Sequence, residues 1–367
     1  MIDSGRSDLE ELLTEVDDRY RLTAEMEEYR RGVVKDLSIA VVGFGKMGLL
    51  HSTIISLLGA GSLRSVVDKS RALRYFAPKV MKNVSFFSGL DKMIAQEPDA
   101  VYVTTPVASH ASILTRLLEQ GVRNIFVEKP PTIDTEQLLQ ITDILGQNQI
   151  VMVGLQKRYA FTFRHAKSLL DNGIIGEPQR VISKIKSNDI GAKTGRFDSI
   201  ERGVLLDLGI HIVDLLAWML EIGEVVYSSQ KSLYTRVDDV FEAVLRSKKG
   251  AMINLEVSWS DPEYRLPETQ IEILGSHGTI TVTEDFVRLH VDKDQTLAKM
   301  TGDACRYKPH YYQGVPPVNI ADPEYTFENL HFLHCIHNRL EPETSMKAMV
   351  ENMRVIDDMY SKAKEKT

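Results

Sequence analysis

Cysteine is scarce in this 367-residue sequence, which contains only Cys305 and Cys335. Two cysteines are too few for a disulfide framework, so a reducing compartment is expected. Apolar runs are also short, and none approaches the roughly 20 residues that span a bilayer. The acidic beginning MIDSGRSDLEELL lacks the apolar core of a signal peptide. These absences predict a cytoplasmic protein without a membrane partner.

The sequence also lacks a block of basic residues, and its formal net charge is −7. Because phosphate backbones are bound by clustered lysine and arginine, nucleic acid is not an expected partner. Hydrophobic residues make up 43% and charged residues 26% of the chain, which is an ordinary composition for a globular protein. The length is sufficient for two domains with their own cores.

Charge sets residues 1–36 apart from the rest, because this segment contains six Lys or Arg and eleven Asp or Glu. Its apolar residues fall near helical spacing, which predicts a charged helical extension. The extension is expected to pack on the surface, and a contact in a dimer is the alternative.

From Leu37 the chain alternates between short apolar strands and helices. Strands are predicted at Leu37–Val42, Leu63–Val67, Val84–Phe87, Ala100–Thr104, Asn124–Val127 and Ile150–Val153. Helices are predicted at Met47–Leu58, Ser109–Gln120 and Thr135–Gln147. This alternation predicts an α/β fold in which residues 37–155 form a Rossmann domain with a doubly wound parallel sheet.

After residue 155 the pattern changes to helices and extended alternating segments. Helices are predicted near Phe163–Asp171, Val204–Leu220, Phe327–Arg339 and Met346–Lys364. Strands are predicted at Val225–Thr235, Val240–Ser247, Ala251–Ser258, Gln270–Leu274, Thr279–Val282 and Val287–Val291. Residues 156–367 are therefore predicted to form an α+β domain that binds substrate and carries a large, open, mostly antiparallel sheet.

The first predicted strand leads directly into a glycine-rich motif that opens a helix, Gly43-Phe44-Gly45-Lys46-Met47-Gly48. In this context the glycines allow a tight turn, approach of a pyrophosphate and close helix packing, and the helix N-terminus attracts phosphate. The second strand ends at Asp68, whose carboxylate can bind ribose hydroxyls and would repel a 2′-phosphate. NAD is therefore favoured, while Lys69 and Arg71 leave NADP open; a solvent-facing Asp68 is the alternative.

The motifs that follow in the chain are similar to those of the Gfo/Idh/MocA oxidoreductases, the family of glucose–fructose oxidoreductase and inositol 2-dehydrogenase. The resemblance covers about residues 37–365. It rests on the order of seven segments: the glycine motif, Thr105-Pro106 with His110, Glu128-Lys129-Pro130, Gly154 to Tyr159, Gly176-Glu177-Pro178, Asp207 with His211, and Gly275 with Gly278.

Three of these residues suit alcohol oxidation on chemical grounds. Histidine side chains titrate near neutral pH, so His211 can take the hydroxyl proton while a hydride leaves carbon. Asp207 lies four residues earlier and shares a helix face with it. Lys129 follows a parallel strand, where ligands bind, and its ammonium can stabilise a developing alkoxide. The resemblance implies the same catalytic residues, Lys129, Asp207 and His211.

The resemblance also implies further contacts and an assembly. It places Glu128 on the nicotinamide ribose and assigns Thr105, Pro106, His110 and Lys129 to cofactor binding. It implies a small sugar, nucleotide sugar or cyclic polyol as substrate, and a homo-oligomer (dimer or tetramer). The ordinary alternatives are a surface Lys129, a core His211 and an Asp207 that serves only as a helix N-terminal charge.

Two other functions and several further candidate residues are compatible with this sequence. An NAD-dependent glycosidase that oxidises its sugar transiently, or a regulator that only senses a dinucleotide, would use the same fold. Candidate substrate contacts are Arg158, Lys184, Lys186 and Arg196, with a solvated strand face as the alternative for the two lysines and Arg196. A late helix carries His331, His334, Cys335 and His337, but their spacing matches no zinc signature and no metal is expected.

Overall fold

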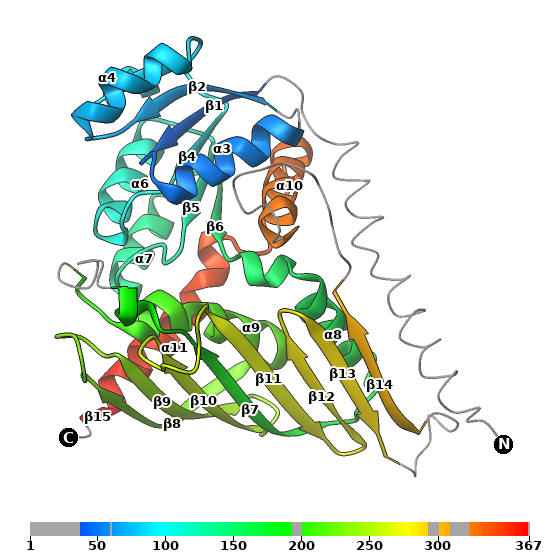
Figure 1. Ribbon diagram of the computed structural model, residues 1–367. Coiled ribbons are helices and arrows are strands. Elements are labelled where there is room, and N and C mark those ends of the chain that lie inside the picture. Colours follow the sequence, from blue (N-terminus) through cyan, green and yellow to red (C-terminus); the bar gives the residue numbers. More distant parts are fainter. Residues whose placement is uncertain (1–36, 59–60, 193–199, 293–300, 309–322, 366–367) are drawn as a thin grey trace. The chain divides into compact units, whose positions relative to one another are not determined.

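The computed structural model describes residues 37–58, 61–192, 200–292, 301–308 and 323–365 (Figure 1). The predicted extension over 1–36 and the candidate Arg196 lie outside the described residues. The described chain divides into two compact units. One comprises residues 37–156 and 323–351, and the other comprises residues 157–308 and 352–365. The sequence analysis placed residues 323–351 with the second domain.

The first unit contains a six-stranded sheet in which every neighbouring pair is parallel. The strand order is β3-β2-β1-β4-β5-β6, which is the doubly wound Rossmann order. The strands are β1 (Leu37–Val42), β2 (Gly61–Val67), β3 (Ser85–Phe87), β4 (Ala100–Val103), β5 (Asn124–Glu128) and β6 (Ile150–Gly154). All six predicted strands are confirmed, because the buried parallel strands are continuous apolar runs that stand out in the sequence, although β3 is only half-buried.

Helices accompany the strands of this sheet. They are α3 (Lys46–Leu58), α4 (Arg71–Val80), α5 (Asp91–Ile94), η1 (Val107–Ser109), α6 (His110–Glu119), α7 (Thr135–Asp143) and α10 (Pro323–Asn338). Helices α4 and α5 were not predicted from the sequence. The helix α7 ends four residues earlier than predicted, where Gly146 follows.

The helix α10 returns to the first sheet although it lies late in the chain. Its Phe332 ring lies 5.5 Å from Tyr102 and 5.7 Å from Phe126, between ring centroids. Nearby, the Thr344 hydroxyl donates to the main-chain oxygen of Val153 at 2.7 Å. Apolar periodicity identifies such a helix but does not say which sheet it covers, so its membership could not be read from the sequence.

The second unit is built on a nine-stranded sheet of order β14-β13-β12-β11-β7-β10-β9-β8-β15. The strands are β7 (Pro178–Lys186), β8 (Ile222–Lys231), β9 (Val240–Ser247), β10 (Met252–Ser258), β11 (Glu268–Gly275), β12 (Gly278–Thr283), β13 (Phe286–Val291), β14 (Gly302–Tyr307) and β15 (Ala363–Glu365). Only the β7–β10 and β8–β15 pairs are parallel. The predicted open, mostly antiparallel sheet is confirmed, although β7, β14 and β15 were missed.

Helices of the second unit pack on one face of this sheet. The helix α8 (Phe161–Asp171) packs on β12 and β13, and α9 (Ile210–Leu220) packs on β7 (Figure 1). A π-helical turn, η5 (Leu205–Gly209), leads directly into α9. The remaining elements are η2 (Gln156–Tyr159), η3 (Asp189–Ala192) and α11 (Met346–Lys362).

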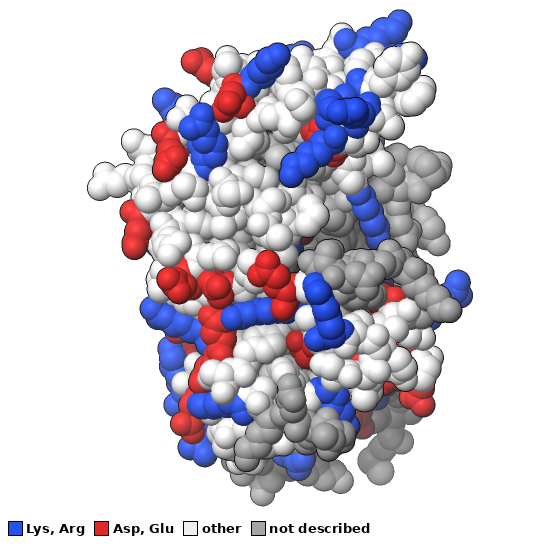
Figure 2. Space-filling view, turned by 90° about the vertical axis from the view of Figure 1, so that its left-hand side faces the viewer, with Lys and Arg blue, Asp and Glu red and all other residues white. Residues whose placement is uncertain are grey.

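Two surface properties complete the description. Among the described residues, no helix has the length and apolar character needed to cross a membrane. The face shown in Figure 2 carries lysine and arginine (blue) intermixed with aspartate and glutamate (red). Charges of both signs therefore share this face.

Candidate active site

The glycine motif forms the turn between β1 and α3. Gly43 has a φ of +89°, a left-handed conformation that favours glycine, and its N–H donates to the main-chain oxygen of Val67 at 2.8 Å. A Cβ on Gly48 would lie 2.3 Å from the Gly43 oxygen. A Cβ on Gly45 would meet nothing within 4 Å. Gly43 and Gly48 are therefore required by the protein itself, whereas Gly45 borders open space just before α3.

Asp68 follows β2 and holds the glycine motif. Its Oδ2 accepts a hydrogen bond from the Phe44 N–H at 2.8 Å, and its Oδ1 accepts one from Ser70 N–H at 2.7 Å. Each carboxylate oxygen has further lone pairs, so ribose hydroxyls can still donate to Asp68. The motif residues Lys46 and Met47 begin α3, and Lys46 is exposed.

His110 ties together the loops that follow β4 and β5. Its Nδ1 lies 2.8 Å from the main-chain oxygen of Pro130, and its Nε2 lies 2.6 Å from that of Thr105. The side chain is only 1% exposed. Burial lowers the pKa of His110, and the two carbonyl oxygens oppose this shift. His110 therefore contributes by positioning the backbone of the Thr105-Pro106 and Lys129-Pro130 segments.

Glu128 and Lys129 stand at the carboxyl end of β5. Glu128 is 8% exposed, and its Oε2 accepts the Lys129 N–H at 3.2 Å. The Lys129–Pro130 peptide bond is cis. The neighbouring strand β4 leads into Thr105 and Pro106, so four of the predicted cofactor residues share this edge of the sheet.

In the second unit, Asp207 lies within the π-helical turn η5 and His211 lies in the first turn of α9. His211 is 5% exposed. The sequence analysis predicted one continuous helix over 204–220, but a π-helical turn closes i→i+5 hydrogen bonds and locally widens the helix. Such turns occur frequently at functional sites. Because η5 continues directly into α9, both candidate residues lie on one helical segment.

Asp238 caps this helical segment and was missed by the sequence analysis. Its carboxylate accepts the N–H groups of Gly203 and Leu205, each at 2.9 Å, and its main-chain oxygen accepts that of Val204 at 2.8 Å. The Tyr360 hydroxyl also donates to the carboxylate, at 3.1 Å. Asp238 thus satisfies three N–H groups at the beginning of the segment, where helices leave them without intrahelical partners.

Two buried groups of the second unit make stability depend on pH in opposite directions. Burial, and then the charge of Arg306, lowers the pKa of His165 from 6.5 to about 4. The free energy of unfolding therefore decreases as the pH falls through this interval. Burial raises the pKa of Asp238 from 3.8 to about 6. The free energy of unfolding therefore decreases as the pH rises through that interval.

Substituting either residue should remove its contribution to the pH dependence of stability and leave that of the other. Relative to the unsubstituted protein, His165→Leu should gain about 3 kcal/mol of unfolding free energy between about pH 6.5 and pH 4. Asp238→Asn should instead gain a similar relative amount, about 3 kcal/mol, as the pH rises from about 4 to 6. Urea unfolding of the three proteins across this range measures both differences. Parallel pH profiles for all three would contradict the assignment.

Arg158, a candidate substrate contact, is occupied by an ion pair within the second unit. Its guanidinium donates to both carboxylate oxygens of Asp214, each at 2.6 Å. Asn352 also donates to Asp214, at 2.6 Å, and Asp214 is 1% exposed. Because Asp214 lies on α9, this pair anchors the helix that carries His211.

The candidates Lys184 and Lys186 lie on β7, where they flank the buried Ile185. Ile185 pairs with Val257 of β10, and a Cβ on Gly209 would lie 3.3 Å from the Val257 side chain. The segment formed by η5 and α9 therefore covers this face. Because strand side chains alternate between faces, both lysines project from the opposite face of the sheet.

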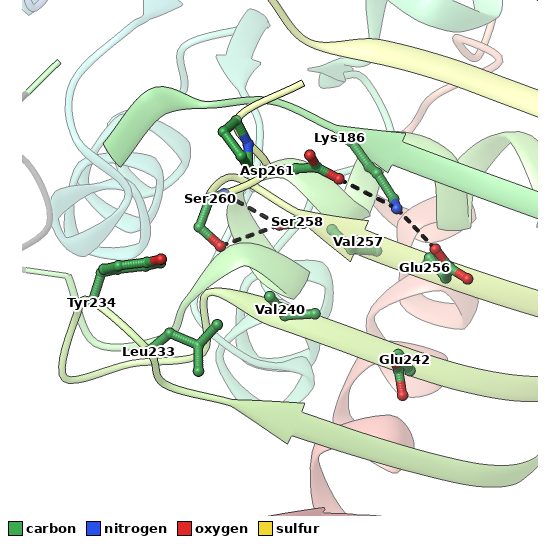
Figure 3. A pocket seen from close by; sticks show the side chains of 11 residues that line it. Lys186, Leu233, Tyr234, Val240, Glu242, Glu256, Val257, Ser258, Ser260 and Asp261 are labelled. Atoms are coloured by element: carbon green, nitrogen blue, oxygen red, sulfur yellow. Dashed lines mark hydrogen bonds and ion pairs between the residues drawn. The ribbon is translucent and has the colours of Figure 1, made fainter. Parts of the chain in front are cut away.

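Lys186 lines a pocket of about 320 Å³ together with Glu242, Glu256 and Asp261. Figure 3 shows its ammonium between two of these carboxylates, 3.0 Å from Glu256 and 3.5 Å from Asp261. Lys184 donates to the Tyr264 hydroxyl at 3.0 Å. The two lysines are thus engaged by neighbours on the sheet face away from α9.

The late histidines of α10 have ordinary partners. The Nε2 atom of His331 accepts the Glu343 N–H at 3.1 Å and lies 3.5 Å from the Cys335 sulfur. Burial raises the pKa of the Cys335 thiol to about 12. Over the described ranges, no group of three or more His, Cys, Asp or Glu is arranged to hold a metal ion.

Comparison with known proteins assigns both units. Residues 37–155 match the family described as "Oxidoreductase family, NAD-binding Rossmann fold". Residues 163–281 match the GFO/IDH/MocA C-terminal domain. The chain belongs to the GFO/IDH/MocA oxidoreductase family. It is accordingly an NAD-binding oxidoreductase, as the glycine motif and Asp68 predicted.

Individual GFO/IDH/MocA relatives are distant in sequence. The chain is 24% identical to the scyllo-inositol 2-dehydrogenase (NAD(+)) of Bacillus subtilis (strain 168) over 321 residues, 83% of this chain and 87% of that protein. An Agrobacterium radiobacter oxidoreductase, solved with NAD+, L-tartaric acid and magnesium, superposes with a TM-score of 0.78 at 18% identity, covering 89% and 96% of the chains. Levoglucosan dehydrogenase with NADH and levoglucosan gives 0.76 at 18%, covering 89% and 97%. The two structures establish a shared fold.

The residues of this GFO/IDH/MocA chain fit a bound NAD. Gly45 leaves open space in front of the α3 N-terminus, where a pyrophosphate needs close approach to the backbone. Asp68 offers a carboxylate for the adenosine ribose beside the same turn. Glu128 and Lys129 lie at the carboxyl edge of the sheet, where dinucleotides bind in doubly wound folds.

Proposed function

We propose that this protein oxidises a hydroxyl-bearing carbon of a cyclic polyol or a sugar with NAD, and reduces the corresponding ketone in reverse. The observation that carries the proposal is the cofactor edge of the first unit, where Lys129 follows Glu128 and β5 in a chain of this oxidoreductase family. The inositol dehydrogenase relatives and the sugar-binding structural neighbour support an inositol or a pyranose as the first substrate class to test.

Three side chains would divide the proton chemistry. His211 takes the proton of the reacting hydroxyl as the carbon–oxygen double bond forms. Lys129 donates a hydrogen bond to the same oxygen and stabilises its developing negative charge. Asp207, four residues before His211, orients the imidazole and stabilises its protonated form. We propose that the first unit binds cofactor and that the second supplies the base and the substrate pocket.

Cofactor binding would follow from residues of the first unit. When bound, NAD supplies the nicotinamide ring that accepts the hydride. The glycine motif binds the pyrophosphate, Asp68 the adenosine ribose and Glu128 the nicotinamide ribose. Thr105 and Pro106, whose backbone His110 positions, border the cofactor site. Because Asp68 repels a 2′-phosphate, NAD is expected to bind more tightly than NADP.

A substrate screen tests this function. Inositol stereoisomers, hexoses, 1,6-anhydrohexoses and nucleotide sugars are incubated with NAD or NADP, and absorbance of the reduced nicotinamide is recorded. The proposal predicts net NADH formation with at least one cyclic polyol or sugar and a preference for NAD. Cleavage of a glycoside without net NADH would instead indicate the glycosidase alternative. Tight NAD binding with no turnover of any compound would indicate a dinucleotide-sensing regulator.

We also propose that the protein is a homo-oligomer that associates through the sheet face opposite α9. That face exposes Ile182 on β7 by 42%, and the nearby loop exposes Leu233 by 58% and Tyr234 by 68%. Exposed apolar side chains of this kind are typical of protein interfaces. Light scattering should give a dimer or tetramer, and Ile182→Glu should reduce its size. A monomeric unsubstituted protein would contradict the proposal.

A reducing, cytoplasmic location is proposed from the cysteines. Cys305 is exposed and Cys335 is buried, and both are free thiols. An exposed free thiol persists in a reducing compartment. Cell fractionation tests this location, and recovery of the protein with secreted material would contradict it.

A further inference from the structure

We infer that His51 is a positioning residue for the cofactor, which holds the Glu128 carboxylate in the orientation that receives the nicotinamide ribose. The inference rests on the proposed role of Glu128. His51 lies on α3, the helix whose N-terminus lies within the glycine motif, and no role was predicted for it from the sequence. Its side chain is fully buried, with 0% exposure.

His51 joins three elements of the first unit through its two ring nitrogens. The Nε2 atom lies 2.9 Å from the Oε1 atom of Glu128 at the end of β5. The Nδ1 atom lies 2.9 Å from the amide nitrogen of Asn329 on α10. The ring also packs against Phe126, with centroids 4.7 Å apart. The imidazole is therefore held both in its plane and across its face.

Asn329 holds the other ring nitrogen of His51. Its amide nitrogen donates to the main-chain oxygen of Tyr325 at 2.7 Å, which fixes the orientation of the amide. The same nitrogen lies 2.9 Å from Nδ1 of His51, and the amide oxygen lies 3.3 Å from it. Because an ionised carboxylate only accepts hydrogen bonds, Nε2 is the ring nitrogen that donates to Glu128. This arrangement commits Oε1 of Glu128 to His51.

The second carboxylate oxygen of Glu128, Oε2, consequently lies at the end of β5 beside the Lys129 N–H. Oε2 accepts the Lys129 N–H at 3.2 Å and keeps a further lone pair for a ribose hydroxyl. A single helix would thus serve both halves of the dinucleotide. Its N-terminus faces the pyrophosphate, and its buried histidine fixes the carboxylate for the distal ribose.

The experiment compares binding of NADH and of ADP, which lacks the nicotinamide ribose. Titration calorimetry is carried out with the full-length protein and with His51→Leu, Glu128→Gln and the double variant. His51→Leu should weaken NADH binding about tenfold or more, the usual loss for a hydrogen bond to a charged group. ADP binding should stay unchanged. The double variant should bind NADH no more weakly than Glu128→Gln, because both residues act on one contact.

A conservative variant separates positioning from folding. In His51→Gln the amide N–H can take the place of Nε2–H, so NADH affinity should return close to that of the unsubstituted protein. This variant, with thermal melting, also serves if His51→Leu does not fold. Equal losses of NADH and ADP binding, or failure of His51→Gln to restore NADH binding, would overturn the inference.

The outcome also separates this inference from the proposed function. If Glu128→Gln weakens NADH binding and His51→Leu does not, the role of His51 is wrong and that of Glu128 stands. If Glu128→Gln leaves NADH binding unchanged, the ribose contact itself is wrong, and the premise of the inference is overturned with it.

Discussion

His211→Ala should lower kcat for polyol or sugar oxidation by about 10²–10⁴-fold, the usual contribution of a positioned general base, while the Kd for NAD should stay unchanged. The reason is that the reacting hydroxyl loses its proton acceptor at the moment the hydride leaves. NAD binds to residues of the first unit, whereas His211 belongs to α9 of the second, so affinity for the cofactor is preserved. Steady-state kinetics and NADH fluorescence titration measure the two quantities.

Two variants serve as partners in this test. Lys129→Met should also lower kcat, because the developing alkoxide loses a charged hydrogen-bond donor. His290→Ala is the matched control, since His290 is an exposed histidine of β13 that pairs with Asp303. Its kcat should equal that of the unsubstituted protein. Full activity in both His211→Ala and Lys129→Met would remove these residues from the mechanism.

Gly45→Ala should leave the unliganded protein as stable as before and weaken NAD binding by about tenfold or more. A Cβ at this position meets no protein atom within 4 Å, so the substitution has no steric consequence until the pyrophosphate approaches. Gly48→Ala should differ, because its Cβ would lie 2.3 Å from the Gly43 oxygen and 2.9 Å from the Thr104 hydroxyl. The resulting backbone shift should cost about 1–3 kcal/mol of stability and also weaken NAD binding.

Gly89→Ala provides the control for this pair. Gly89 belongs to the same unit, also has no atom within 4 Å of a built Cβ, and follows β3 rather than the turn between β1 and α3. It should change neither the melting temperature nor the Kd for NAD. If Gly45→Ala binds NAD as tightly as Gly89→Ala does, the pyrophosphate does not lie against Gly45.

The cofactor edge could be predicted because its signals are local in the sequence. Gly43, Gly45 and Gly48 lie within six residues of one another, and Asp68 directly follows the next strand. Parallel strands with helices between them give continuous apolar runs, so the first sheet was predicted strand by strand. The strand β7 was missed because its polar residues, among them Lys184 and Lys186, reach the solvated face of the second sheet.

Residues that act across long sequence separations could not be found in this way. His51 meets Glu128 across 77 positions and Asn329 across 278. Asp238 binds the N–H groups of Gly203 and Leu205, which lie 35 and 33 positions earlier. A single histidine on an apolar helix, or one aspartate between strands, has no pattern that names such a partner. These contacts depend on how the sheets bring distant segments together.

Isotope transfer tests the central claim most directly. The protein is incubated with NAD and a substrate from the screen that carries deuterium on its ring carbons, and the NADH formed is analysed by mass spectrometry. Direct hydride transfer from a hydroxyl-bearing carbon predicts NADH that is heavier by one deuterium. NADH formed without deuterium, or consumption of the substrate without any NADH, would contradict the account.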